Sequence, residues 1–160
     1  MSGSGRYEPT KGDPLDAISV LSRDHRRLLD LAQRFKGGLE AGRERAQLLE
    51  EMAEELATHA SIETEILFPA VQEEVPGSED FARRRIEEAE DLLREASRFR
   101  QLDRVSPRLE RRATRLIREI DHHVETEEDQ VFALLTQKLD DERLARLGAE
   151  LARARRSTRA

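Results

Sequence analysis

Cysteine is absent from this chain of 160 residues, so disulfide bonds, thiolate zinc sites and cysteine nucleophiles are all excluded. Glycine and proline are scarce, with 8 and 5 copies, and aromatic residues make up only 4% of the chain. No apolar run approaches membrane-spanning length, and the polar amino terminus has no signal-like apolar core. We therefore expect a soluble, cytoplasmic protein, in which any metal must be bound by histidine and carboxylate side chains.

Charged residues, in contrast, make up 39% of the chain. A high charged fraction with few glycines, prolines and aromatics is typical of long amphipathic helices and fits β-sheets poorly. The length suits a single domain that is large enough to bury a core. The formal net charge of −6 disfavours a nucleic-acid partner, so we expect neither nucleic acid nor membrane among the partners.

Two copies of a His-x-x-x-Glu motif are the most informative feature of the sequence. His59 precedes Glu63 by four residues, and His123 precedes Glu127 by four. Residues four apart lie on the same face of a helix, so an imidazole nitrogen and a carboxylate oxygen can converge on one point. Two such helices facing each other would offer the ligands of the di-metal carboxylate centres that are built inside helix bundles.

The same offset of 64 residues relates the two motifs and the apolar residues around them. It maps His59 to His123 and Glu63 to Glu127. It also places apolar residues on apolar residues, pairing Met52 with Leu116, Leu56 with Ile120, Leu67 with Val131 and Phe68 with Phe132. The chain therefore looks like two copies of a helix pair.

Apolar periodicity and helix-boundary residues predict an all-α protein. The expected helices cover 13–36, 43–68, 78–102 and 106–138, followed by a short fifth helix over 140–152. Asp13, Ser78 and Asp140 are expected to cap helices, and Pro69 is expected to end or kink the second helix. Helices of about 36 Å joined by short connections predict an antiparallel up-down-up-down four-helix bundle with a short C-terminal helix.

The domain division follows from these helices. We expect residues 1–12 to form a flexible N-terminal tail and residues 13–152 to form the bundle. Residues 153–160, which contain four arginines and no acid, are expected to be a frayed basic tail.

The candidate ligands fall in one layer of the predicted bundle. At about 1.5 Å of rise per residue, His25 in the first helix lies level with His59 and His123 near the middle of the bundle. Glu63 and Glu127 interrupt apolar stripes, where a carboxylate without a partner would cost roughly several kcal/mol. Each acid alone would be explained by pairing with a histidine or an arginine, but two matched pairs and His25 in one layer favour a metal centre. His122 points to another face and is expected on the surface.

The chain resembles the hemerythrin-like (HHE cation-binding) family in three stretches. They are Asp24-His25, His59-x-x-x-Glu63 with Leu67-Phe68-Pro69, and His123-x-x-x-Glu127 with Val131-Phe132. The resemblance is to its bacterial single-domain form and covers about residues 14–152. It implies a four-helix bundle around a non-haem di-iron centre with an oxo or hydroxo bridge. It also implies that His25, His59 and His123 are terminal ligands, and that Glu63 and Glu127 bridge the two iron ions.

One position departs from the family pattern. The family places a further histidine on the third helix, and the internal repeat puts the corresponding slot at Ala89. Glu90 lies beside this slot. Either Glu90 turns inward and supplies an oxygen ligand, or it is solvated and one iron is left with an open position. With Glu90 included, the candidate metal ligands are His25, His59, Glu63, Glu90, His123 and Glu127.

The sequence therefore predicts a metal-binding, non-haem di-iron protein that binds or reacts with O2, NO or peroxide. One alternative is a catalase- or peroxidase-like di-iron oxidoreductase, so an enzymatic role stays open. Another alternative is an iron storage or exchange protein. His/carboxylate sites also accept manganese or zinc, and a bundle without metal remains the simplest alternative. The expected partner is a small diatomic ligand or peroxide, and the expected assembly is a monomer or weak dimer.

Overall fold

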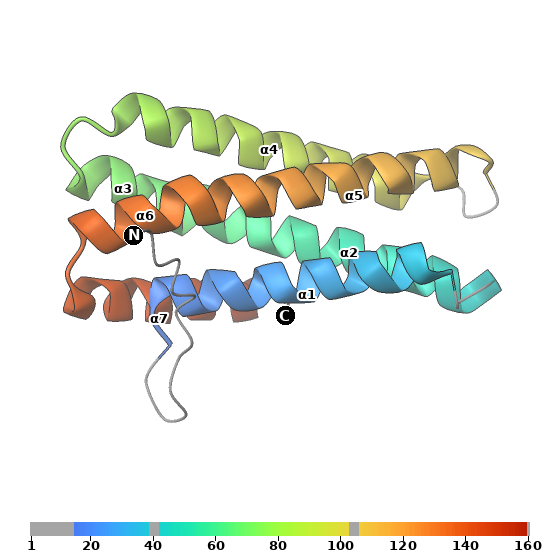
Figure 1. The fold of residues 1–160 in the computed structure, drawn as a ribbon, viewed down its shortest axis with the longest axis horizontal. Helices are drawn as coiled ribbons and strands as arrows, with labels where there is room; N and C mark the ends of the chain where they lie inside the picture. Colours follow the sequence, from blue (N-terminus) through green and yellow to red (C-terminus); the bar gives the residue numbers. More distant parts are fainter. Residues whose placement is uncertain (1–14, 39–41, 103–105, 160) are drawn as a thin grey trace, which may run out of the picture.

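A computed structural model describes residues 15–38, 42–102 and 106–159, so the predicted tail at 1–12 and the predicted cap Asp13 lie outside the described residues. These ranges contain helices and no β-strand. The long helical segments lie side by side in Figure 1, and consecutive segments run antiparallel. The predicted four-helix bundle is confirmed. None of the helices in the described ranges combines the length and apolar character needed to cross a membrane.

The first helix pair begins with α1 (Ala17–Gly37). The Asp16 side chain caps α1 by accepting from the Ser19 N–H at 2.8 Å, and Gly38 ends it in a left-handed conformation with φ of 65°. The second long segment consists of α2 (Gly42–Ile62), the π-helical turn η1 (Glu63–Leu67) and α3 (Phe68–Glu74).

The second helix pair repeats this order. It consists of α4 (Glu79–Gln101), α5 (Arg108–Thr126), the π-helical turn η2 (Glu127–Val131) and α6 (Phe132–Lys138). The turns η1 and η2, and the helices α3 and α6, have bounds that differ by the same 64 residues as the motifs. The internal repeat is therefore present in the backbone as well as in the sequence.

Two helix boundaries differ from the prediction. Pro69 does not end the second segment, because it lies in the first turn of α3, where a missing backbone N–H is tolerated. Ser78 precedes α4, but its hydroxyl donates to the carbonyls of Val71 and Val75, at 2.9 and 2.6 Å, instead of capping α4. The hydroxyl therefore satisfies carbonyls at the end of α3, which continues the second segment beyond the predicted boundary.

The C-terminal helix α7 (Asp141–Arg159) is longer than predicted, and residues 153–158, which we expected to fray, are helical. Asp140 caps it as predicted, accepting from the Arg143 N–H at 2.8 Å. In Figure 1 α7 lies along one half of α1. Its buried apolar side chains are those of Leu144, Leu147 and Leu151. The predicted weak apolar face is therefore a packed one.

Close backbone packing also holds α7 against the start of α1. A Cβ on Gly148 would overlap the Leu15 carbonyl oxygen and would lie 2.7 Å from the Asp16 Cα. Only glycine permits this approach. Arg143 adds an ion pair to Glu74 at 2.6 Å, so α7 is also attached to the end of α3.

The apolar core is divided into two clusters along the bundle. On α1, Leu21 belongs to one cluster and Leu28 to the other, and the buried His25 lies between them. The same change of cluster occurs between Ala60 and Ile62 at the end of α2. A polar layer therefore separates two hydrophobic halves at the level of the candidate ligands.

Candidate metal centre

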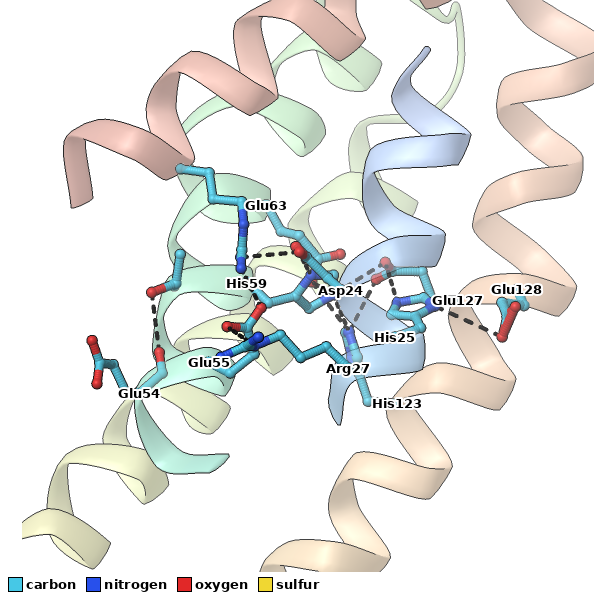
Figure 2. Close-up of polar contacts among 12 residues, drawn as sticks. Asp24, His25, Arg27, Glu54, Glu55, His59, Glu63, His123, Glu127 and Glu128 are labelled. Atoms are coloured by element: carbon cyan, nitrogen blue, oxygen red, sulfur yellow. Dashed lines mark hydrogen bonds and ion pairs between the residues drawn. The ribbon is translucent and has the colours of Figure 1, made fainter. Parts of the chain in front are cut away.

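Five of the six predicted ligands meet in this polar layer. The side chains of His25, His59, Glu63, His123 and Glu127 converge between α1, the α2–η1 junction and the α5–η2 junction (Figure 2). Their exposed fractions are 1%, 0%, 0%, 11% and 2%, in that order. Only His123 therefore lies near the surface.

The Nε2 atoms of all three histidines face this common centre. His25 Nε2 lies 3.1 Å from Glu127 Oε1, and His123 Nε2 lies 3.2 Å from Glu127 Oε2. His59 Nε2 lies 3.2 Å from His123 Nε2. One ligand atom from each of these four residues lies within 4.8 Å of the others. Ligand atoms on opposite sides of a metal ion are about 4 Å apart, so this spacing suits a bound cation.

Glu63 supplies the strongest sign that the cluster is built for a cation. Its Oε1 lies 3.0 Å from His59 Nε2 and 3.1 Å from His123 Nε2. The angles of these contacts are unsuited to hydrogen bonds, so both buried oxygens of Glu63 lack a hydrogen-bond partner. A buried carboxylate with unsatisfied oxygens is costly unless a cation binds it. The residues therefore fit a metal.

The imidazole of His59 is oriented by a neighbour on α1. Its Nδ1 lies 2.9 Å from Asp24 Oδ2, and Asp24 is 3% exposed. Because a carboxylate accepts hydrogen bonds, Nδ1 of His59 carries the proton that it donates to Asp24, and Nε2 is the nitrogen that faces the centre. This carboxylate–histidine arrangement is the usual support of a metal-binding imidazole.

The imidazole of His25 is held by an aromatic ring and lies near an acid. Its ring stacks on Phe132, with centroids 5.6 Å apart and an interplanar angle of 6°. Its Nδ1 lies 3.7 Å from Glu128 Oε2, at the more exposed edge of the site. Both neighbours belong to the second copy of the repeat, so α1 and the η2–α6 segment together fix this ring.

The acids change the proton affinity of the three histidines. Burial by itself lowers the pKa of His123, but the charges of Glu127 and Glu63 outweigh it and raise the pKa to about 10. The pKa values of His59 and His25 are also raised, because Glu63, Asp24 and Glu127 more than offset their burial. Burial would raise the pKa of Glu127, but the neighbouring histidines hold it well below its usual range. The acids of the metal-free centre therefore favour the protonated imidazoles, most clearly that of His123.

The local backbone is unusual at both acidic ligands. Glu63 is the first residue of η1 and Glu127 is the first residue of η2. The Phe68 N–H bonds to the Glu63 carbonyl, and the Phe132 N–H bonds to the Glu127 carbonyl, which closes the wide turn. Pro69 has no counterpart in the second copy, so proline is not the shared cause. Wide turns of this kind are frequent at functional sites.

The sixth predicted ligand, Glu90, is not part of the cluster. It lies on the exposed face of α4, while the neighbouring Ala89 is buried at 1% exposure. Successive residues on a helix point about 100° apart, so only one of the two can face the core. The layer on α4 falls between Ile86 and Ala89, so α4 presents apolar side chains to the polar layer. We therefore leave Glu90 out of the proposed ligand set.

Sequence reasoning missed the residues that surround His59. Asp24 was noted only as part of a motif, and Glu55 and Arg155 were not singled out. Glu55 is 1% exposed and pairs with Arg27 at 3.0 Å and with Arg155 at 2.5 Å. The available signal was the basic segment at the C-terminus, which contains no acid of its own. Its arginines could be expected to pair with acids elsewhere in the chain, as Arg155 does with Asp24 and Glu55.

A family model described as the hemerythrin HHE cation-binding domain matches residues 16–135, three quarters of the chain. The match includes all five clustered residues and ends before α7. No curated protein and no solved structure gives a significant match to the chain.

Proposed function

Because the chain belongs to the hemerythrin HHE cation-binding family, we propose that its His/Glu centre holds two iron ions and binds O2, NO or peroxide. The supporting observation is the fully buried Glu63 carboxylate, whose oxygens accept no hydrogen bond and which lies beside the Nε2 atoms of His59 and His123. Histidine and carboxylate ligands from facing helices are the set used by di-iron carboxylate bundles. A di-iron centre supplies the redox chemistry toward such ligands.

The protein side chains have distinct parts in this proposal. His25, His59 and His123 would hold the metal through their Nε2 atoms, and Glu63 and Glu127, which lie against these nitrogens, would hold it through their carboxylate oxygens. The two apolar clusters on either side of the layer exclude water from the centre. A small ligand reaches the centre most directly beside His123, which at 11% is the most exposed of the five ligands.

A second candidate function, peroxide- or O2-consuming oxidoreductase, is favoured by the asymmetry of the ligand set. The repeat supplies two histidines and two glutamates as matched pairs, but His25 has Ala89 as its counterpart. The three histidines would therefore be shared unequally between two ions. An ion with fewer protein ligands would have room for an external ligand, which suits turnover as well as binding.

Iron loading tests the proposal directly. Protein loaded with Fe(II) without oxygen and then desalted is expected to hold about two irons per chain. Reversible bleaching by dithionite and recolouring in air would favour O2 binding, and sustained peroxide consumption would favour the enzyme. Spectra of the iron-loaded protein recorded with and without NO test whether the centre also binds NO. Failure to retain any transition metal under chelator-free conditions would refute the proposal.

Metal binding is expected to release protons. The pKa of each histidine in the centre is raised, to about 10 for His123, so a metal ion must displace protons that the neighbouring acids favour on these imidazoles. Affinity should therefore rise with pH, by about tenfold per pH unit for each proton released. The stability that these protons give the metal-free fold is present below pH 6.5, the ordinary histidine value, and is lost as pH rises toward 10.

Calorimetry of Zn²⁺ binding in buffers with different ionisation enthalpies measures this release. The observed heat at pH 7.5 should depend on the buffer, with at least about one proton, that of His123, released per chain. A heat that is the same in all buffers would contradict the prediction.

A further inference from the structure

Arg155, on α7, connects the C-terminal helix to the metal centre. Its Nη1 lies 2.9 Å from Asp24 Oδ1, and its Nη2 lies 2.5 Å from Glu55 Oε1. The contact with Asp24 is an ion pair whose angle falls outside that of a hydrogen bond. Asp24 and Glu55 are 3% and 1% exposed, and Arg155 itself is 18% exposed. Arg155 therefore neutralises two buried carboxylates at once.

The two oxygens of Asp24 serve different partners. Oδ1 lies against Arg155, and Oδ2 accepts from His59 Nδ1 at 2.9 Å. Arg155, Asp24 and His59 thus form a continuous chain from α7 to the centre. A buried carboxylate held on one side by a guanidinium keeps a fixed orientation, so the hydrogen bond on its other side is also fixed.

Arg155 is itself held firmly by the rest of its surroundings. Glu55 is fixed from its other side by Arg27, which donates to Oε2 at 3.0 Å. The packing of α7 through Leu147, Leu151 and Gly148 sets the position of its backbone. Arg155 also lies outside residues 16–135, which the family model matches. The position of Arg155 is therefore set by a part of this chain that the family description does not include.

We propose that Arg155 is a positioning residue of the metal centre, which acts through Asp24 to hold His59 with Nδ1 protonated and Nε2 directed at the metal. The C-terminal helix α7 is then part of the centre, because it delivers this arginine. The proposal rests on the proposed metal-binding function. Loss of Arg155 leaves Asp24 less constrained, so the His59 ring moves more freely and the metal dissociates faster.

The test compares Arg155→Met, which keeps the length but removes the charge, with the control Arg156→Met on the exposed face of the same helix turn. The first readout is the His59 Nδ1–H resonance in metal-free protein labelled with ¹⁵N-histidine. It should exchange with water faster in Arg155→Met and remain unchanged in Arg156→Met. The second readout is the transfer of Zn²⁺ from the loaded protein to EDTA, which should be about tenfold faster in Arg155→Met only.

Arg155→Lys keeps a positive charge but cannot contact both carboxylates in the same way, so its Zn²⁺ release should fall between wild type and Arg155→Met. If Arg155→Met fails to fold, the same two readouts on Arg155→Lys decide the question. Unchanged His59 exchange and unchanged Zn²⁺ release would overturn the proposal, as would equal changes in Arg156→Met. If the wild-type protein binds no metal, the proposed function fails, but the resonance of the metal-free protein still tests the link from Arg155 to His59.

Discussion

Replacing His59 with alanine is expected to lower the iron content from about two ions per chain to less than one. Its Nε2 lies within 3.5 Å of Glu63, Glu127 and His123, and its Nδ1 is held by Asp24, so this imidazole is fully buried among the other members of the cluster. The loss of affinity should exceed the roughly 10- to 100-fold effect that is typical of removing an outer partner of a metal ligand. Elemental analysis and the visible spectrum after Fe(II) loading measure the effect.

The matched control is Glu90→Ala, because Glu90 was a predicted ligand but lies on the exposed face of α4. This variant should keep the iron content and spectrum of the wild type. His59→Ala also leaves a cavity and removes the partner of Asp24, so the metal-free variant should lose about 2–4 kcal/mol of stability. Iron should therefore be measured on protein that circular dichroism shows to be helical. Full iron occupancy in folded His59→Ala would contradict the assigned site.

The bundle and most of the centre could be predicted because their signals are local and repeated. A histidine and a glutamate four residues apart identify one face of a helix, and the offset of 64 residues shows that the pattern occurs twice. The structure extends this repeat to the backbone, where η1 and η2 begin at Glu63 and Glu127. No periodicity argument distinguishes a π-helical turn from an α-helical one, so these turns were not predicted.

The rest depended on contacts that are distant in the sequence. Arg155 and Glu55 are separated by 100 residues, and nothing near either residue indicates the other. We expected the segment with Arg155 to fray because it is charged and terminal, but Leu147 and Leu151 hold α7 against the bundle and two buried acids receive the arginine. The orientation of Glu90 also depends on distant contacts. Ala89 and Glu90 are adjacent on the helix, and the packing of α4 against the other helices decides which of the two faces the core.

The polar layer weakens the metal-free fold, and this gives the second large prediction. Glu63→Met should raise the free energy of unfolding of metal-free protein by about 1 kcal/mol and abolish its stabilisation by metal. Methionine fills a similar volume without the two unsatisfied oxygens, and His59 and His123 can lose their protons once the carboxylate is gone. When free Zn²⁺ is present at about 1,000 times its dissociation constant, the wild-type protein should gain about 4 kcal/mol of stability from the metal. The variant should gain almost none.

Urea unfolding with and without Zn²⁺ measures both effects. Glu65→Met is the control, because Glu65 is exposed in the same π-helical turn and its replacement should change stability by less than about 0.5 kcal/mol. The sign of the stability change that Glu63→Met causes in metal-free protein distinguishes a metal ligand from a partner in a structural ion pair. If Glu63 served only as a partner for His59 and His123, its removal would destabilise the metal-free protein and leave the response to Zn²⁺ unchanged. A metal ligand instead costs stability until the metal binds, because its buried oxygens accept no hydrogen bond in the metal-free protein.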